Sequence, residues 1–154
     1  MFELILYQPE IPPNTGNIIR LCANSGANLH VIRPLGFELD DKQLRRAGLD
    51  YHEFATLQVH DTLEACIELL GERRMFAIST RGTTDYSSAS YREGDAFLLG
   101  PETRGLPQAV LDALPAEQVL RIPMRPENRS LNLSNAAAIL IYEAWRQQGF
   151  AGGT

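Results

Sequence analysis

Residues 14–20, Asn-Thr-Gly-Asn-Ile-Ile-Arg, bring amides and a guanidinium together near the start of a predicted helix. Asn17, Arg20 and Asn24 are spaced three and four residues apart, so on a helix they form one polar stripe. A helix N-terminus and a guanidinium both bind anions, and amides can hold a ribose or a phosphate. The pattern therefore favours recognition of a phosphorylated ligand. The plainer alternative is that Asn14 caps the helix and Arg20 is solvated surface.

A second segment with chemical potential is residues 97–107, where an apolar strand runs into Gly-Pro-Glu-Thr-Arg-Gly-Leu-Pro. Gly100 would let a ligand approach the backbone, and Gly105 would permit a second sharp bend. Glu102 comes just after the strand end. Two glycines and two prolines around Glu-Thr-Arg are more than a turn requires, which favours a ligand-binding loop. The alternative is a strand–helix connector with Glu102 on the surface.

A third segment, residues 120–135, leaves a strand at Pro123 and crosses a loop before the last helix. The loop carries two arginines, Arg125 and Arg129, which with Arg121 make a basic cluster. Ser130, Asn132, Ser134 and Asn135 supply more possible capping residues than one helix start needs. The alternative is an elaborate cap on a packing helix.

The elements that must position these segments alternate along the chain. Expected strands are residues 2–7, 29–32, 56–59, 74–80, 95–99 and 118–123; expected helices are 14–25, 41–47, 61–70, 107–114 and 132–148. We expect Pro12-Pro13 to form an extended turn, Asp61 to cap the third helix, and 81–84 to be a polar loop. This alternation predicts an α/β fold, with a parallel sheet and helices on both faces, in a single domain of residues 1–154. Ligands of such sheets bind beyond the carboxyl ends of the strands.

Bulk properties narrow the function classes. The chain has 154 residues and a formal net charge of −5, so any nucleic-acid site must be a local basic patch. No apolar run could span a membrane and no signal peptide is visible, which predicts a cytoplasmic protein. Cys22 and Cys66 are expected as buried thiols. Dinucleotide and P-loop motifs are absent, no Cys/His spacing resembles a zinc site, and His30, His52 and His60 are scattered, so no metal is expected.

Taken together, the three segments resemble the three signatures of the SPOUT methyltransferases of the tRNA/rRNA 2′-O type. The matching motifs are Asn-x-Gly-Asn-x-x-Arg, Gly-Pro-Glu-x-x-Gly-Leu and Ile-Pro-Met…Ser-Leu-Asn-x-Ser, in that order. The resemblance covers the chain from Leu4 to Trp145. The short length, without an appended RNA-binding domain, is similar to family members that methylate the wobble cytidine or uridine of leucine tRNAs.

This resemblance implies a C-terminal trefoil knot, S-adenosyl-L-methionine as cofactor, tRNA as substrate and a homodimer. By matching position it implies the following cofactor contacts: Ile78, Thr80, Leu99, Gly100, Glu102, Ile122, Met124, Ser130 and Leu131. The last helix is apolar nearly all round, which favours a partner subunit as its second cover. Tyr142 on that helix is a weaker site candidate near the expected dimer seam.

The resemblance also implies catalytic roles for Arg20, Asn17 and Asn132. We expect Arg20 to grip a phosphate and stabilise the developing oxyanion, because arginine does not normally deprotonate in proteins. Asn17 and Asn132 would orient the ribose, and Arg20, Arg125 and Arg129 would bind RNA. Two alternatives stay open: a 2′-O-methyltransferase for rRNA or another tRNA position, and a non-catalytic RNA-binding module on the same fold.

Overall fold

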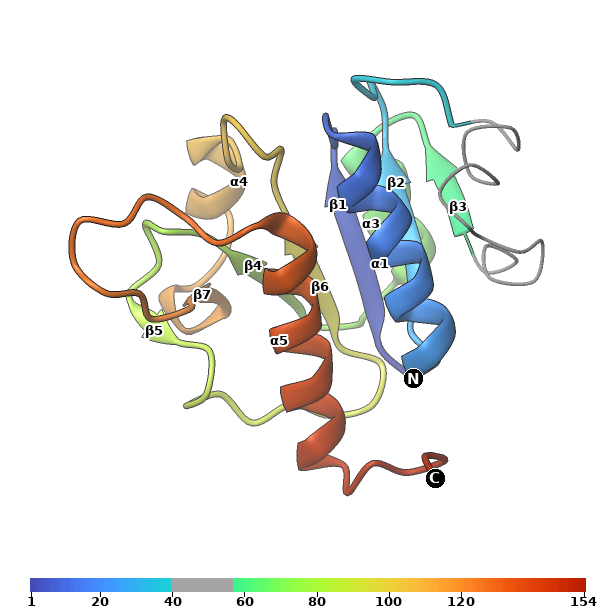
Figure 1. Cartoon of the computed structure of the whole chain (residues 1–154), viewed down its shortest axis with the longest axis vertical. Helices are drawn as coiled ribbons and strands as arrows, with labels where there is room; N and C mark the ends of the chain where they lie inside the picture. Colours follow the sequence, from blue (N-terminus) through green and yellow to red (C-terminus); the bar gives the residue numbers. More distant parts are fainter. Residues whose placement is uncertain (40–56) are drawn as a thin grey trace.

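The computed structural model describes residues 1–39 and 57–154. Its seven strands form one parallel sheet in the order β3-β2-β1-β6-β4-β7-β5 (Figure 1). The strands are β1 (Glu3–Tyr7), β2 (Asn28–Ile32), β3 (Leu57–His60), β4 (Met75–Ile78), β5 (Thr84–Asp85), β6 (Ala96–Leu99) and β7 (Val119–Arg121). The helices are α1 (Pro12–Ser25), α3 (Leu63–Leu70), α4 (Gln108–Asp112) and α5 (Leu133–Gln147), with a 3₁₀ turn at Ala116–Gln118. The expected parallel α/β sheet is confirmed.

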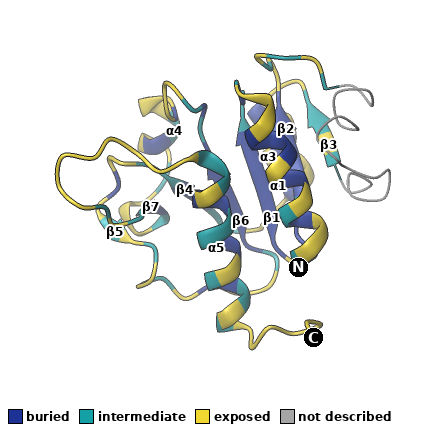
Figure 2. Ribbon diagram, in the orientation of Figure 1, coloured by how far each residue is buried: buried dark blue, intermediate teal, exposed yellow. Residues whose placement is uncertain are grey.

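Helices cover both faces of the sheet, as the sequence predicts. On one face α1 and α5 lie side by side over Leu4, Leu6 and Phe97; on the other, α3 and α4 cover Ile5 and Leu98. The central strands are therefore buried from both sides, and this explains why they are continuous apolar runs rather than alternating patterns. Figure 2 shows the dark, buried sheet between helices whose outer sides are exposed. None of the helices that the structure describes is long and apolar enough to cross a bilayer.

The centre of the sheet determines where the site lies. Leu99, at the end of β6, pairs in register with Leu6 of β1 and with Ile78 of β4. The turn into α1 and the loops after β4, β6 and β7 therefore leave the sheet at one edge. This edge is where ligands of parallel α/β sheets bind.

The start of α1 differs from the sequence prediction. Pro12 and Pro13 belong to the first helical turn instead of forming an extended turn, and the N-cap is Ile11, which has no capping side chain. Proline suits this position because the first helical N–H groups have no partner within the helix. The helix ends as predicted, at Gly26, which has a left-handed φ of 82°.

Other predictions need smaller corrections. The N-cap of α3 is Thr62, whose hydroxyl accepts from the Ala65 N–H, whereas Asp61 pairs with Arg33 on the surface. The predicted polar loop 81–84 ends in the short strand β5, which pairs with β7. The expected helix 41–47 and His52 lie outside the described residues. The trefoil knot implied by the resemblance stays a prediction.

Candidate active site

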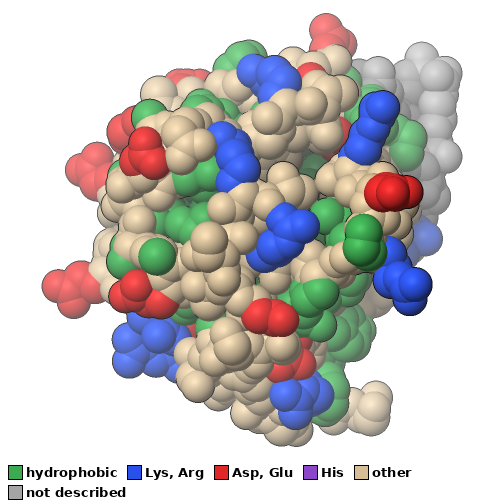
Figure 3. All heavy atoms as spheres, turned by 90° about the vertical axis from the view of Figure 1, so that its left-hand side faces the viewer, with side chains coloured by type: hydrophobic (Ala, Val, Ile, Leu, Met, Phe, Trp, Pro, Cys, Tyr) green, Lys and Arg blue, Asp and Glu red, His purple; other side chains and the backbone are tan. Residues whose placement is uncertain are grey.

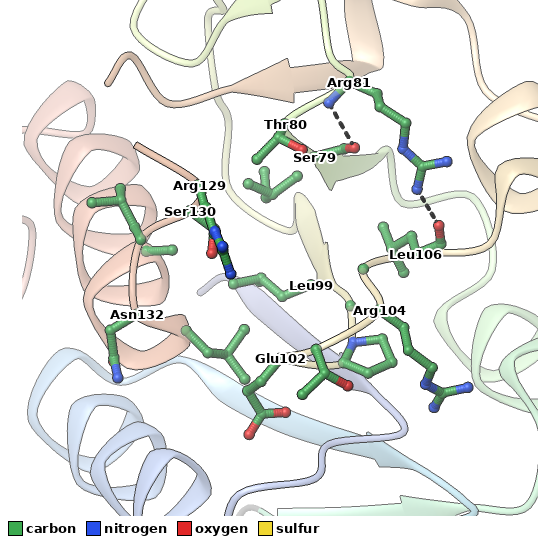
Figure 4. Close-up of a pocket in the computed structure, with 18 of the residues that line it drawn as sticks. Ser79, Thr80, Arg81, Leu99, Glu102, Arg104, Leu106, Arg129, Ser130 and Asn132 are labelled. Carbon is green, nitrogen blue, oxygen red and sulfur yellow. Dashed lines mark hydrogen bonds between the residues drawn. The ribbon is translucent and has the colours of Figure 1, made fainter. Parts of the chain in front are cut away.

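A cavity of about 760 Å³ lies at the carboxyl edge, among the loops that follow β4, β6 and β7 (Figure 4). All nine predicted cofactor contacts line it: Ile78, Thr80, Leu99, Gly100, Glu102, Ile122, Met124, Ser130 and Leu131. Asn132 and Arg129 line it as well. The structure thus brings the second and third sequence segments to one place, although residues 108–119 separate them along the chain.

Glu102 connects this cavity to α1. Its carboxylate accepts the backbone N–H groups of Glu10 and Ile11, at 2.9 and 2.7 Å, and the Asn14 side-chain amide at 3.3 Å. These two N–H groups lie just before the first turn of α1, whose first two residues are prolines without an N–H, so Glu102 fixes the entry of the chain into the helix. In Figure 4 its carboxylate points toward the N-terminal part of the chain. Glu102 therefore links the loop after β6 to the start of α1 by hydrogen bonds, and it is not a solvated surface side chain.

Asn14 extends the same network to α5. Its Oδ1 accepts from Asn132 Nδ2 at 3.0 Å, while Asn132 Oδ1 accepts the N–H groups of Ser134 and Asn135 and so caps α5. The sequence interpretation treated Asn14 only as a possible helix cap and missed this role. Its signal was available, because Asn14 is the first residue of the Asn-x-Gly-Asn-x-x-Arg motif.

The two glycines of the second segment serve the loop itself. A Cβ on Gly100 would lie 2.5 Å from the Leu106 nitrogen and 2.6 Å from the Gly105 carbonyl carbon. The loop's own returning backbone therefore requires a glycine at this position, and the approach of a ligand to the Gly100 backbone stays a prediction. Gly105, with a φ of 69°, makes the second bend as predicted.

Arg81 is a further residue of this site that the sequence interpretation missed. Its guanidinium donates to Gln108 Oε1 at 2.6 Å and to the Leu106 carbonyl, so it joins the loop after β4 to the loop after β6 (Figure 4). No motif marked it, because an arginine in a polar loop is ordinary.

Thr103 links the loop after β6 to the residues before α1. Its backbone N–H and its hydroxyl both donate to the Glu10 carboxylate, and these hydrogen bonds hold the pKa of that carboxyl below its usual value.

The cavity rim is basic although the chain is acidic. Arg81, Arg104 and Arg129 line the cavity together with one acidic residue, Glu102. Figure 3, which views the molecule from the left of Figure 1, shows basic side chains across the middle of the face, with acidic ones at its left side and also at its lower and right parts. An electropositive rim of this kind suits an anionic ligand despite an overall negative charge.

The remaining predicted site residues lie outside the cavity. Asn17 and Arg20 are exposed on α1, and Arg125 is exposed in the loop before α5. The α1 segment contributes Ile11 and Asn14 to the lining instead. Within one chain, the structure does not bring Arg20 to the predicted cofactor contacts.

This geometry agrees with what the chain resembles. A model of the SpoU rRNA methylase family matches residues 1–142. The chain belongs to the SpoU rRNA methylase family. The resemblance to the SPOUT methyltransferases and the assignment as a methyltransferase are thereby confirmed.

Relatives within the SpoU family are close and full-length. The tRNA (cytidine(34)-2′-O)-methyltransferase of Methylovorus glucosotrophus is 62% identical over 152 residues, 99% of each chain. The Escherichia coli K12 enzyme of the same name is 59% identical, over 99% of this chain and 97% of its own.

Solved structures give the same picture. One that concerns the 2-OH methylation of C/U34 on tRNA is 49% identical with a TM-score of 0.90, over 97% of both chains. An S-adenosylmethionine-bound rRNA methyltransferase from Sinorhizobium meliloti is 26% identical with a TM-score of 0.81, over 94% of this chain and 56% of that one. The expected methyl donor is thus confirmed at the level of the SpoU family.

Proposed function

We propose that this protein transfers a methyl group from S-adenosylmethionine to the ribose 2′-hydroxyl of nucleotide 34, cytidine or uridine, in tRNA. The observation that carries the proposal is the convergence on one cavity of the nine residues that the resemblance implies as cofactor contacts, from three separate loops. Full-length relatives named for this reaction support it. The finer proposal, leucine tRNAs as substrates in the cytoplasm, rests on the sequence resemblance.

The cavity suits the proposed cofactor. Its volume of about 760 Å³ lies in the range of small-molecule sites, and Ile78 and Ile122, both partly exposed, offer apolar surface for an adenine ring. Backbone groups at the ends of β4 and β6 can recognise the edge of that ring. When bound, S-adenosylmethionine supplies a methyl group activated by its sulfonium. The protein's task is then to place the ribose oxygen in line with that methyl group and to stabilise the charge on it.

Glu102 is poorly suited to be the base that removes the hydroxyl proton. Its two carboxylate oxygens already accept from two backbone N–H groups and from Asn14. We infer that Arg20 grips a phosphate beside the reacting ribose and stabilises the oxyanion, with Asn17 and Asn132 orienting the ribose. Arg125 and Arg129, on the exposed loop before α5, would hold the RNA backbone.

Because Arg20 does not line its own chain's cavity, we propose a homodimer in which Arg20 serves the partner's cavity. The outer side of α5 supports this: Tyr142 is 42% exposed, and Ala138 and Ile139 are half-buried. Mixed dimers test it. One chain carries Arg20→Ala, and the other carries Thr80→Trp to block the cavity. Action across the dimer restores one working site of two, whereas action within a chain restores none.

The reaction itself is tested with purified tRNA and isotope-labelled S-adenosylmethionine, followed by mapping of the labelled nucleotide. We expect 2′-O-methylated nucleotide 34 in leucine tRNAs. Label in rRNA or at another tRNA position would support the alternative substrates. RNA binding without methyl transfer would support the non-catalytic module. Arg20→Ala should abolish transfer, and Arg20→Lys should restore little of it, because lysine lacks the planar two-point grip on phosphate.

A further inference from the structure

Three metal-ligating side chains meet beneath α3, away from the cavity. His30 lies on β2, His60 ends β3, and Cys66 lies on α3. The two histidines are 30 positions apart in the sequence. One ligand atom from each residue falls within 4.8 Å of the others, and His30 Nδ1 is 2.9 Å from His60 Nε2. His30 and Cys66 are buried, whereas His60 is partly exposed. The sequence expectation of no metal rested on spacing along the chain, and the fold brings distant residues together.

Glu3 supplies a second, independent observation. It is 5% exposed, and its Oε1 lies 3.6 Å from Nε2 of His30. Among the described residues, neither Glu3 Oε2 nor His30 Nε2 has a hydrogen-bond partner. Arg73 and Asn28 favour the charged form of this carboxylate, but its second oxygen is still buried without a hydrogen-bond donor from the part of the chain that the structure describes, which is costly. Metal-binding histidines commonly direct their second ring nitrogen at such a carboxylate, which fixes the ring orientation.

We propose that His30, His60 and Cys66 bind one Zn²⁺ ion, with Glu3 orienting His30. The ligands would be His30 Nδ1, His60 Nε2 and the Cys66 thiolate, a donor set that suits zinc. The charges also balance, because a divalent ion offsets the thiolate and the Glu3 carboxylate. On binding, the Cys66 thiol releases its proton, and the proton of neutral His30 resides on Nε2, facing Glu3.

The required adjustment is small. In a tetrahedral zinc site the ligand atoms lie roughly 3.3–3.7 Å apart, given bonds of about 2.0–2.3 Å. The two imidazole nitrogens must therefore separate by about half an ångström from their present 2.9 Å, and the sulfur must move toward them. The partly exposed side of His60 leaves room for water as a fourth ligand. The ion would join β2, the edge strand β3 and α3, which is a stabilising role and not a catalytic one.

The test uses the full chain without an affinity tag. The protein is stripped with a chelator, titrated calorimetrically with Zn²⁺, and titrated with Co²⁺ as an optical probe. We expect one equivalent per chain, a thiolate-to-cobalt charge-transfer band, and a higher thermal unfolding temperature with Zn²⁺. Glu3→Gln should weaken binding by about 10–100-fold.

Matched variants separate a specific site from surface binding. Cys66→Ser should abolish the charge-transfer band, and Cys22→Ser, at the other buried cysteine, should leave it unchanged. Substitution of the buried Cys66 can impair folding, so His60→Gln at the partly exposed position is a second variant, which should lower Zn²⁺ affinity at least tenfold. Absence of stoichiometric binding in the folded wild type, or equal binding by wild type and His60→Gln, would overturn the proposal.

Discussion

Asn132 donates its side-chain amide to Oδ1 of Asn14 over 3.0 Å, although 118 positions separate the two residues. Asn14 also donates to Glu102, so one chain of hydrogen bonds joins the first, second and third motif segments. The start of α1, the loop after β6 and the start of α5 are thereby fixed relative to one another. A substitution that breaks these hydrogen bonds in one segment should therefore also loosen the other two segments.

Asn14→Ala tests this network. We expect a loss of about 1–3 kcal/mol in the free energy of unfolding, because Asn132 and Glu102 lose a partner at a largely buried position. Urea denaturation measures it. The control is Asn24→Ala, on the exposed side of the same helix, which should change stability by less than about 0.5 kcal/mol. Equal effects of the two substitutions would show that the network contributes nothing.

Glu102→Gln separates positioning from base catalysis. Glutamine cannot accept both backbone N–H groups as a carboxylate does, so the loop after β6 should loosen. We expect a higher KM for S-adenosylmethionine and an unchanged pH profile of kcat, with stability lower by about 1.5–3 kcal/mol. Steady-state kinetics across pH provide the measurement. A collapse of kcat together with a shifted pH profile would instead identify Glu102 as the base.

Gly82→Ala should damage the wall of the cavity. A Cβ at this position would lie 2.6 Å from the Leu120 carbonyl oxygen, so the loop after β4 could not stay against β7. We expect a destabilisation of about 1–3 kcal/mol and loss of cofactor binding, measured by calorimetry. The comparison is Gly26→Ala, which has open space around the added Cβ and a strained φ of 82°. It should lose stability and keep binding.

Arg74→Met should expose the cost of an uncompensated buried charge. Arg74 Nη2 lies 2.6 Å from a carboxylate oxygen of Asp95, which is 2% exposed, and its Nε donates to the second oxygen. Removal of one partner from a buried pair costs about 3–5 kcal/mol. Thermal and urea unfolding should both register the loss. The surface pair Arg33–Asp61 is the control, and Arg33→Met there should cost no more than about 1 kcal/mol.

Cys22 gives a prediction for alkaline pH. Burial, and to a lesser extent Glu3, raise the pKa of its thiol from 9.0 to about 12. The unfolded chain therefore loses this proton first, so the stability that Cys22 contributes is present below pH 9 and declines as pH rises toward 12. In the wild-type protein, with the labelled cysteine identified by peptide mass spectrometry, a thiol reagent should label Cys22 at pH 8 only after unfolding. Rapid labelling of the native protein would contradict the burial of this thiol.

The sequence was informative where chemistry depends on strand ends and motif order. Apolar runs predicted the sheet, and the resemblance to the SPOUT methyltransferases implied nine residues that share one cavity in the structure. The sequence was less informative where a residue contacts another residue that lies far from it along the chain. The interaction of Glu102 with the start of α1, the packing of Gly100 against Leu106, and the cluster of His30, His60 and Cys66 all depend on contacts that no local pattern encodes. Arg81 was missed because its function comes from the loop opposite it.

The cavity has two kinds of wall. Leu99 and Ile78 are held by strand pairing on the central sheet, whereas residues 122–131 are largely exposed, and the hydrogen bond within them joins Asn128 to the Arg125 carbonyl (Figure 2). Segments with few internal bonds and high exposure open at low energetic cost. One wall is therefore held by the sheet and the other is compliant, so in the proposed reaction the compliant segment would be the part that moves to admit and release the cofactor. Its opening rate would then set how fast spent cofactor leaves, and turnover would depend on loop motion as much as on methyl transfer.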